Sequence, residues 1–256
     1  MTVRLEDITG KQITCALSIT SGSPISVEIA ASLGFRALVI DAEHGPVSPY
    51  SHEMASMVRA ADITGTPVFA RLPEATPGCI NRTLNDGVSG VIVPRVTTAA
   101  DAQAAADASR YPAVGKRGAA PVVRAAGYGV RDWNAYKAES TDRRMVLCLL
   151  GSETATTNAE EILSVSGIDG VVLDIATLAR EKGKASGAVG ELIHAGRVAS
   201  LAGSSGMTCG AIVQCEADAR EWKSAGCNLI IVESDTSVAL RAMTDALATL
   251  KGGVGA

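Results

Sequence analysis

Three ionisable side chains follow a short apolar stretch near the start of the chain. Residues 37–40 read Ala-Leu-Val-Ile and run directly into Asp41, with Glu43 and His44 two and three residues later. In parallel α/β proteins, catalytic groups gather at the carboxyl ends of strands. An imidazole there can take or give a proton near neutral pH, and neighbouring carboxylates can orient it. The pattern therefore predicts an acid–base site built on Asp41, Glu43 and His44.

A cation is expected at the end of the next apolar stretch. Residues 68–73 read Val-Phe-Ala-Arg-Leu-Pro, which places Arg71 at the end of a predicted strand. A guanidinium can hold a carboxylate and stabilise an enolate oxygen. It can also close the end of a barrel through a salt bridge, and both interpretations stay open. His52 and His194 fall in predicted helices, so we interpret them as surface or packing residues.

Apolar stretches alternate with helical patterns along the whole chain. The predicted strands are 13–18, 37–41, 68–72, 90–96, 145–150, 170–174, 209–213 and 229–233, and the predicted helices are 24–33, 50–62, 77–86, 98–109, 156–165, 187–202, 216–225 and 236–250. This alternation is typical of parallel βα units, and eight of them close most simply into a (β/α)8 TIM barrel. We expect one domain over 1–256, in which the irregular segment 111–144 covers the mouth of the barrel.

Composition and charge exclude several classes of protein. The net charge is −4 and no basic cluster occurs, so we expect no nucleic-acid partner and no anionic membrane surface as a partner. No apolar run approaches the roughly 18 residues of a membrane span, and the first residues lack the apolar core of a signal peptide. The cysteines have no spacing typical of a zinc site or a redox pair. The expected location is the reducing cytoplasm. The cysteines are Cys15, Cys79, Cys148, Cys209, Cys215 and Cys227.

Several motifs resemble those of the class II 2-oxo acid aldolases, the family of 4-hydroxy-2-oxoheptanedioate aldolase and 2-dehydro-3-deoxyglucarate aldolase. Asp41-x-Glu-His44 matches the run that carries the family's catalytic histidine, and Arg71 matches its Val-Arg-Pro/Leu-Pro strand. The resemblance extends over about residues 12–250 and implies a TIM barrel, a carbon–carbon lyase and a homo-oligomer such as a hexamer. Further matches are Val93-Pro94, Arg110-Tyr-Pro112, Lys116-Arg-Gly118 and Ser234-Asp-Thr236.

The residues that hold a metal in this family are replaced. The family binds Mg²⁺, Mn²⁺ or Co²⁺ through a glutamate after the fifth strand and an aspartate after the sixth, with a glutamine on the fifth strand beside the substrate. Gly151, Thr177 and Leu149 occupy these three positions. A hard cation needs oxygen ligands, preferably carboxylates, and glycine and leucine side chains have none. We therefore expect no metal cofactor.

Two new carboxylates appear near the lost ligands. Glu153 and Asp174 could form a displaced metal site, act on the substrate as acid and base without a metal, or be solvated loop residues. A carboxylate at 174 would also repel an anionic substrate. The family's partner for the histidine, an aspartate, aligns with Asn85, and Asp86 follows it. An amide can orient an imidazole but does not stabilise imidazolium as a carboxylate does.

The predicted function is that of a divergent aldolase-family lyase or a related enzyme. It would act on a small 2-oxo or β-keto carboxylic acid, with His44 as acid and base, Arg71 as the clamp for the anion and enolate, and Asp41 and Glu43 orienting them. Without a metal to ease enolisation, decarboxylation, hydration and cyclisation are as plausible as aldol cleavage. The alternative is a catalytically silent barrel that binds a metabolite or another protein.

Overall fold

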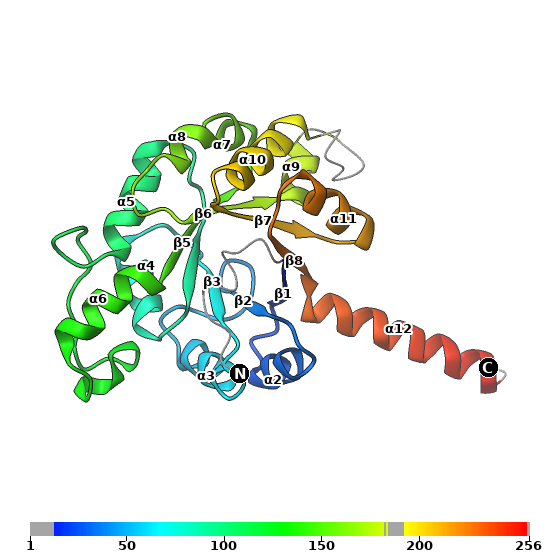
Figure 1. The fold of residues 1–256 in the computed structure, drawn as a ribbon. Coiled ribbons are helices and arrows are strands. Elements are labelled where there is room, and N and C mark those ends of the chain that lie inside the picture. Colours follow the sequence, from blue (N-terminus) through cyan, green and yellow to red (C-terminus); the bar gives the residue numbers. More distant parts are fainter. Residues whose placement is uncertain (1–12, 182, 184–191, 255–256) are drawn as a thin grey trace.

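The strands form a closed barrel, as the sequence predicts. The computed structural model describes residues 13–181, 183 and 192–254. Its strands pair in parallel and in sequence order, with β1 closing onto β8 (Figure 1). They are β1 (Thr14–Ile19), β2 (Ala37–Asp41), β3 (Val68–Arg71), β4 (Gly90–Val93), β5 (Met145–Leu150), β6 (Gly170–Asp174), β7 (Thr208–Val213) and β8 (Leu229–Ser234).

Helices surround the barrel, with some departures from the prediction. The expected helix 156–165 is two short helices that meet at Asn158, and a helix that we did not expect follows β6 directly. The predicted start of helix 187–202 lies outside the described residues, and the described helix begins at Ile193. The helices are α2 (Pro24–Ser32), α3 (His52–Asp62), α4 (Pro77–Asn85), α5 (Ala99–Ser109), η1 (Arg124–Gly129), α6 (Trp133–Arg143), α7 (Glu153–Thr157), α8 (Ala159–Leu163), α9 (Ile175–Glu181), α10 (Ile193–Ser204), α11 (Glu216–Ala225) and α12 (Asp235–Val254).

Both faces of the strands are buried, which explains why they are almost continuously apolar. On β2, Ala37 and Val39 belong to the cluster inside the barrel, whereas Leu38 and Ile40 pack in the layer between strands and helices. Side chains alternate between the two faces of a strand, so a parallel strand covered on both sides needs apolar residues throughout. The interior is narrow where Phe69 crosses it. A Cβ atom on Gly90 would lie 2.7 Å from the Phe69 ring, so glycine is required there.

Strand register brings two of the predicted site residues together. Asp41 and Arg71 are direct partners at the last positions of β2 and β3. Asp174 ends β6 on the same rim. The parallel pairing therefore places these three side chains at the carboxyl-terminal mouth of the barrel.

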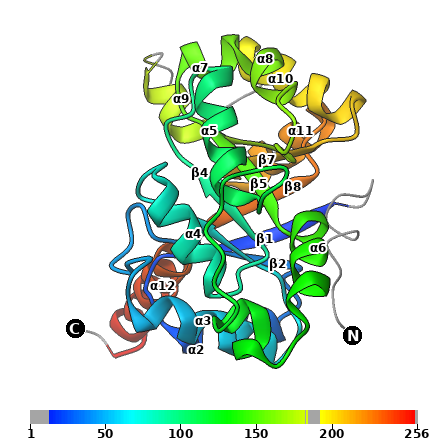
Figure 2. The ribbon, with the colours of Figure 1, turned by 90° about the vertical axis from the view of Figure 1, so that its left-hand side faces the viewer.

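The predicted position of segment 111–144 is wrong. This segment joins the end of α5 to the start of β5, so the chain is already at the amino-terminal end of the barrel when it begins (Figure 2). Its neighbour Arg110 donates to the Gly167 carbonyl at 3.2 Å and to Asp169 at 2.8 Å, just before β6, and Arg124 donates to the Asp86 carbonyl at 2.7 Å, before β4. The segment packs around that end instead of covering the mouth.

Helix α12 extends away from the barrel (Figure 1). It begins where Ser234 Oγ accepts a hydrogen bond from the Ser237 amide at 3.1 Å, a usual way to satisfy a free N–H at a helix start. Asp235 joins this start to the end of β1 by accepting from the Thr20 amide at 2.8 Å. None of the helices in the described ranges is long and apolar enough to cross a membrane.

Candidate active site at the mouth of the barrel

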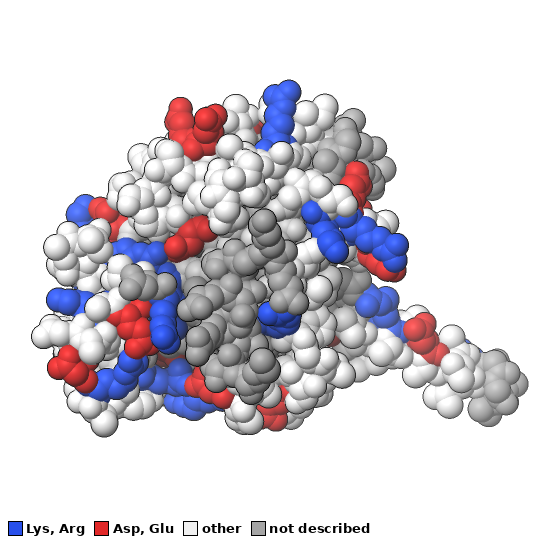
Figure 3. All heavy atoms as spheres, in the orientation of Figure 1, with Lys and Arg blue, Asp and Glu red and all other residues white. Residues whose placement is uncertain are grey.

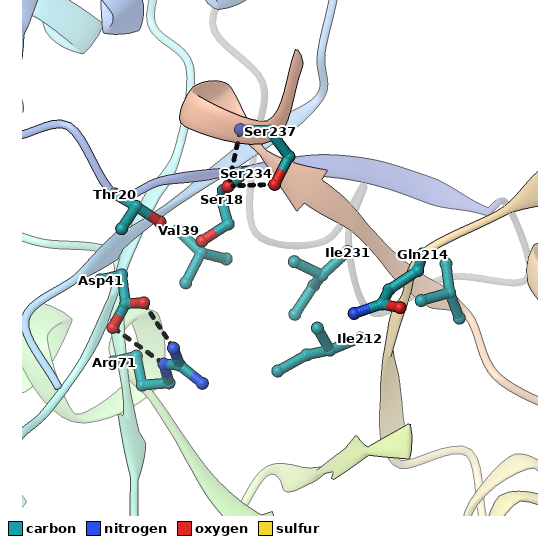
Figure 4. A pocket seen from close by; sticks show the side chains of 11 residues that line it. Ser18, Thr20, Val39, Asp41, Arg71, Ile212, Gln214, Ile231, Ser234 and Ser237 are labelled. Atoms are coloured by element: carbon teal, nitrogen blue, oxygen red, sulfur yellow. Dashed lines mark hydrogen bonds and ion pairs between the residues drawn. The ribbon is translucent and has the colours of Figure 1, made fainter. Parts of the chain in front are cut away.

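An ion pair between Asp41 and Arg71 forms the centre of the site. Arg71 Nε donates to Asp41 Oδ1 at 2.9 Å, and Arg71 Nη2 donates to Asp41 Oδ2, so the contact is bidentate (Figure 4). The two side chains are only 11% and 3% exposed. Asp41 Oδ1 also accepts the amides of Glu43 at 3.1 Å and His44 at 3.0 Å. The same carboxylate therefore fixes the guanidinium and the turn that carries the other two candidates.

Two more carboxylates face the same guanidinium. Glu43 Oε2 lies 3.6 Å from Arg71 Nε, and Asp174 Oδ2 lies 3.9 Å from Arg71 Nη1. Burial raises the pKa of Glu43 above its ordinary value of 4.5, because the opposing charge of Arg71 does not fully compensate. Burial would also raise the pKa of Asp41, but the hydrogen bonds and charge of Arg71 and the two turn amides outweigh it, so that pKa lies below 3.8.

His44 lies at the edge of this group. Its side chain is 67% exposed, and Nε2 is 4.0 Å from Glu43 Oε2. The residues aligned with the family's histidine partner lie elsewhere, at the far end of α4. Asn85 accepts from Arg117 Nη2 at 2.9 Å, and Asp86 accepts from Arg82 at 2.6 Å. Neither Asn85 nor Asp86 contacts His44 within this chain, because α4 carries both to the opposite end of the barrel.

Two neighbouring cavities open at the mouth. Arg71 and Asp41 line one of about 530 Å³, and Glu43, His44 and Asp174 line another of about 300 Å³. The contact between Glu43 and Arg71 joins them. The larger cavity also carries polar groups at or just after strand ends, of which Ser18, Thr20 and Ser237 were not expected from the sequence: Ser18, Thr20, Gln214, Ser234 and Ser237 (Figure 4). The smaller one also includes Arg95, two residues after the end of β4.

The donors at the family's metal position do not fit a divalent cation. Gly151 and Thr177 line the smaller cavity, and neither of these two residues has a carboxylate. Asp174 Oδ1 accepts the Thr177 amide at 3.0 Å, and its other oxygen faces Arg71. Glu153 is not part of this group, since its carboxylate lies 3.7 Å from His194 Nε2. Within the described ranges, no group of three or more His, Cys, Asp or Glu side chains is placed to hold a metal.

We expect Asp41→Asn to lower the free energy of unfolding by about 3 kcal/mol at pH 7, because it leaves a buried guanidinium without its counter-charge. The pKa of Asp41 is lowered on folding, so its carboxylate stabilises the fold above the unfolded value near 3.8, and this contribution is lost as the pH falls further. Urea unfolding should show the difference from wild type shrinking below about pH 4. Glu161→Gln, an exposed change of equal charge, should have little effect; an Asp41→Asn loss that is constant with pH would contradict the assignment.

Comparisons with known proteins identify the family and agree with the barrel fold. The model of the HpcH/HpaI aldolase/citrate lyase family matches residues 15–242. A 2-keto-3-deoxy-L-rhamnonate aldolase of Shigella sonnei (strain Ss046) is 32% identical over 94% of this chain and 90% of its own. A 2-dehydro-3,6-dideoxy-6-sulfogluconate aldolase of Pseudomonas putida is 36% identical over 60% and 59%. A solved family protein from Burkholderia cenocepacia J2315 superposes with a TM-score of 0.87 at 28% identity, over 96% and 98% of the two chains. The chain belongs to the HpcH/HpaI aldolase/citrate lyase family, and its members named here confirm the predicted lyase class.

Proposed function

We propose that this protein is a carbon–carbon lyase, or a closely related enzyme, that acts on a small 2-oxo or β-keto carboxylic acid without a divalent metal. The observation that carries the proposal is the buried Arg71 guanidinium, fixed by Asp41 at the mouth of the barrel. The aldolase relatives act on 2-keto-3-deoxy acids, as their names state, which supports an acid of this kind as substrate.

Arg71 supplies the positive charge for the reaction. Nε and Nη2 are engaged by Asp41, whereas Nη1 makes no hydrogen bond to any described residue. In our proposal, Nη1 donates to the substrate's oxo oxygen, where negative charge develops as an enolate forms. An oxygen placed there competes only with the 3.9 Å contact to Asp174, so the strong pair with Asp41 is retained.

Glu43 and His44 would move the proton. Glu43 lies between Arg71 and His44, and its raised pKa brings its protonation closer to neutral pH, as a general acid or base requires. The largely exposed imidazole of His44 can exchange that proton with water. With Gly151 and Thr177 at the metal position, the substrate must enolise readily by itself. Decarboxylation, hydration and cyclisation therefore stay alongside aldol cleavage as candidate reactions.

A silent barrel is the second candidate. Three carboxylates surround Arg71, and an anionic substrate must compete with them for the guanidinium. In this alternative the ion pairs only close the barrel, and the cavities bind a metabolite without chemistry.

Two substitutions separate these candidates. If the protein is an enzyme, His44→Ala should lower kcat by about 10²-fold, following the usual scale of acid–base catalysis. Arg71→Lys should lower kcat at least about tenfold although it keeps the charge, because an ammonium cannot hold Asp41 and the substrate with one planar fork. The assay is turnover of a panel of 2-oxo and β-keto acids, with circular dichroism to verify folding. His52→Ala, on an exposed position of α3, is the control. Equal turnover in wild type and both site variants would favour the silent barrel.

The metal position can be tested by restoring its ligands. We expect Gly151→Glu combined with Thr177→Asp to create a site for Mn²⁺, because a Cβ atom at 151 has room at 3.8 Å from Thr177 Cγ2 and 3.9 Å from Asp174 Cβ. Calorimetric titration should detect binding in this double variant and none in the wild type. The control is Gly151→Gln with Thr177→Asn, which has side chains of the same size without the negative charges. Wild-type affinity for Mn²⁺ equal to that of the double variant would contradict a metal-independent site.

We further propose that the protein is a homo-oligomer in which α12 packs against another copy. Large apolar side chains recur along its exposed surface at Leu240, Met243, Leu247 and Leu250, between 53% and 70% exposed. Most of the helix is uncharged on the face shown in Figure 3. A single projecting helix is marginal in water unless its apolar face is covered. A hexamer stays a prediction.

Charge placed on this helix should break the assembly. We expect Met243→Glu with Leu247→Glu to reduce the mass measured by light scattering after size exclusion to that of one chain, because carboxylates cannot be buried in an apolar contact. Lys251→Glu, which changes the charge of α12 by the same amount near its end, should leave the mass unchanged. A wild-type monomer, or an assembly that survives the double change, would contradict the proposal.

The cytoplasm stays the expected location. All six cysteines are free thiols, and four of them are buried: Cys79, Cys148, Cys209 and Cys227. Free thiols are usual in reducing compartments.

A further inference from the structure

A further polar cavity lies at the opposite end of the barrel from Arg71. It has a volume of about 500 Å³ and is lined by residues that precede β3, β4 and β5, among them Thr66, Ser89 and Arg144. Arg124, Arg131 and Asp62 complete its charged lining. Asp62 pairs with Arg124 and Glu139 pairs with Arg131, so the three guanidiniums have two carboxylate partners. On the side of the molecule where α6 lies, Lys and Arg side chains are interspersed with acidic ones (Figure 3).

Arg144 lacks a counter-charge. Its Nη1 donates to the Val88 carbonyl at 2.9 Å, and its Nε is buried without a hydrogen-bond partner. No carboxylate of the described chain lies within ion-pair distance of it. Burial lowers the pKa of this guanidinium; the charges of Arg117 and Arg131 act in the same direction, and those of Tyr136 and Glu139 oppose it. A buried cation in this state is costly unless an anion approaches it.

The other two arginines are held in place by their own contacts. Arg124 donates through Nη1 to the Asp86 carbonyl at 2.7 Å and through Nη2 to Asp62. Arg131 donates to Glu139, and its guanidinium lies 5.5 Å from the centre of the Tyr136 ring. The cavity is therefore bordered by guanidiniums whose positions are fixed before any ligand arrives, which reduces the entropic cost of binding one.

We propose that this cavity binds a small anion through a phosphate group. Planar guanidinium forks match the tetrahedral oxygens of phosphate, and three of them have more N–H donors than the two carboxylates Asp62 and Glu139 engage. The volume leaves room for a short organic group attached to the phosphate. The ligand is thus either inorganic phosphate or a small phosphomonoester. This site is independent of the proposed lyase function, since no residue of the mouth takes part in it.

Calorimetric titration with inorganic phosphate and with glycerol phosphate, at constant ionic strength, tests the proposal. We expect saturable binding of one ligand per chain. Arg131→Gln and Arg144→Lys should each weaken it by about tenfold or more, because each removes a fork from the cavity. Arg220→Gln, which breaks an exposed pair on α11, is the matched control and should bind as wild type does. Tighter binding of the ester identifies a metabolite as the ligand, and equal binding identifies the ion itself.

A variant that binds phosphate more tightly than wild type cannot be explained by misfolding, so it complements the variants that lose affinity. Asp62 is 60% exposed and competes for Arg124, so Asp62→Asn should bind phosphate several-fold more tightly than wild type. Glu216→Gln makes the same change of charge on α11 and should have no effect. Absence of saturable binding to wild type, unchanged affinity in both Arg131→Gln and Arg144→Lys, or unchanged affinity in Asp62→Asn would overturn the proposal.

Discussion

The buried ion pair between Asp41 and Arg71 is the interaction on which the mouth of this barrel depends. Strand register makes the two residues neighbours, and the same aspartate oxygen accepts the amides that shape the turn with Glu43 and His44. Pairing of β2 with β3, the form of that turn and the direction of the guanidinium are therefore coupled. A side chain that must satisfy three partners has little freedom, so the positive charge is fixed before a substrate arrives, which is the condition for efficient electrostatic catalysis.

The balance of charge around Arg71 limits what the site can bind. Asp41 neutralises the guanidinium directly, and Glu43 and Asp174 add negative charge on either side. An acid substrate gains most if one of these carboxylates is protonated, and the raised pKa of Glu43 makes it the natural one. In this account, binding of the substrate anion is accompanied by uptake of a proton at Glu43. This proton removes the repulsion between the Glu43 carboxylate and the substrate, and it is the proton that Glu43 later transfers. The replacement of the metal-binding carboxylates by Gly151 and Thr177 is consistent with this charge balance. A cation bound there would need nearby negative charge, and the carboxylates of Glu43 and Asp174 already face Arg71.

The barrel was predictable because a strand covered on both sides must be apolar along its length and because helical patterns separate such strands. The positions of Asp41 and Arg71 at strand ends could be predicted from the sequence, but their mutual pairing follows from register, which the sequence does not display. Segment 111–144 was assigned to the wrong end of the barrel. Its aromatic and glycine-rich sequence indicates an irregular structure but does not indicate which end of the barrel it covers. Alignment places Asn85 at the family's position for the partner of the histidine, but the direction of α4 decides at which end of the barrel that residue lies. The length of α12 was nearly correct, yet only the structure shows that it leaves the barrel.

The central claim is that Arg71, without a metal, stabilises an enolate formed by transfer of a proton in this site. Exchange of the methyl protons of pyruvate for deuterium, followed by proton NMR in D₂O with EDTA present, measures that step directly and needs no knowledge of the natural substrate. The account predicts exchange faster than in buffer alone, unchanged when Mg²⁺ or Mn²⁺ replaces the EDTA. Exchange that begins only when a metal is added, or none under either condition, would contradict it.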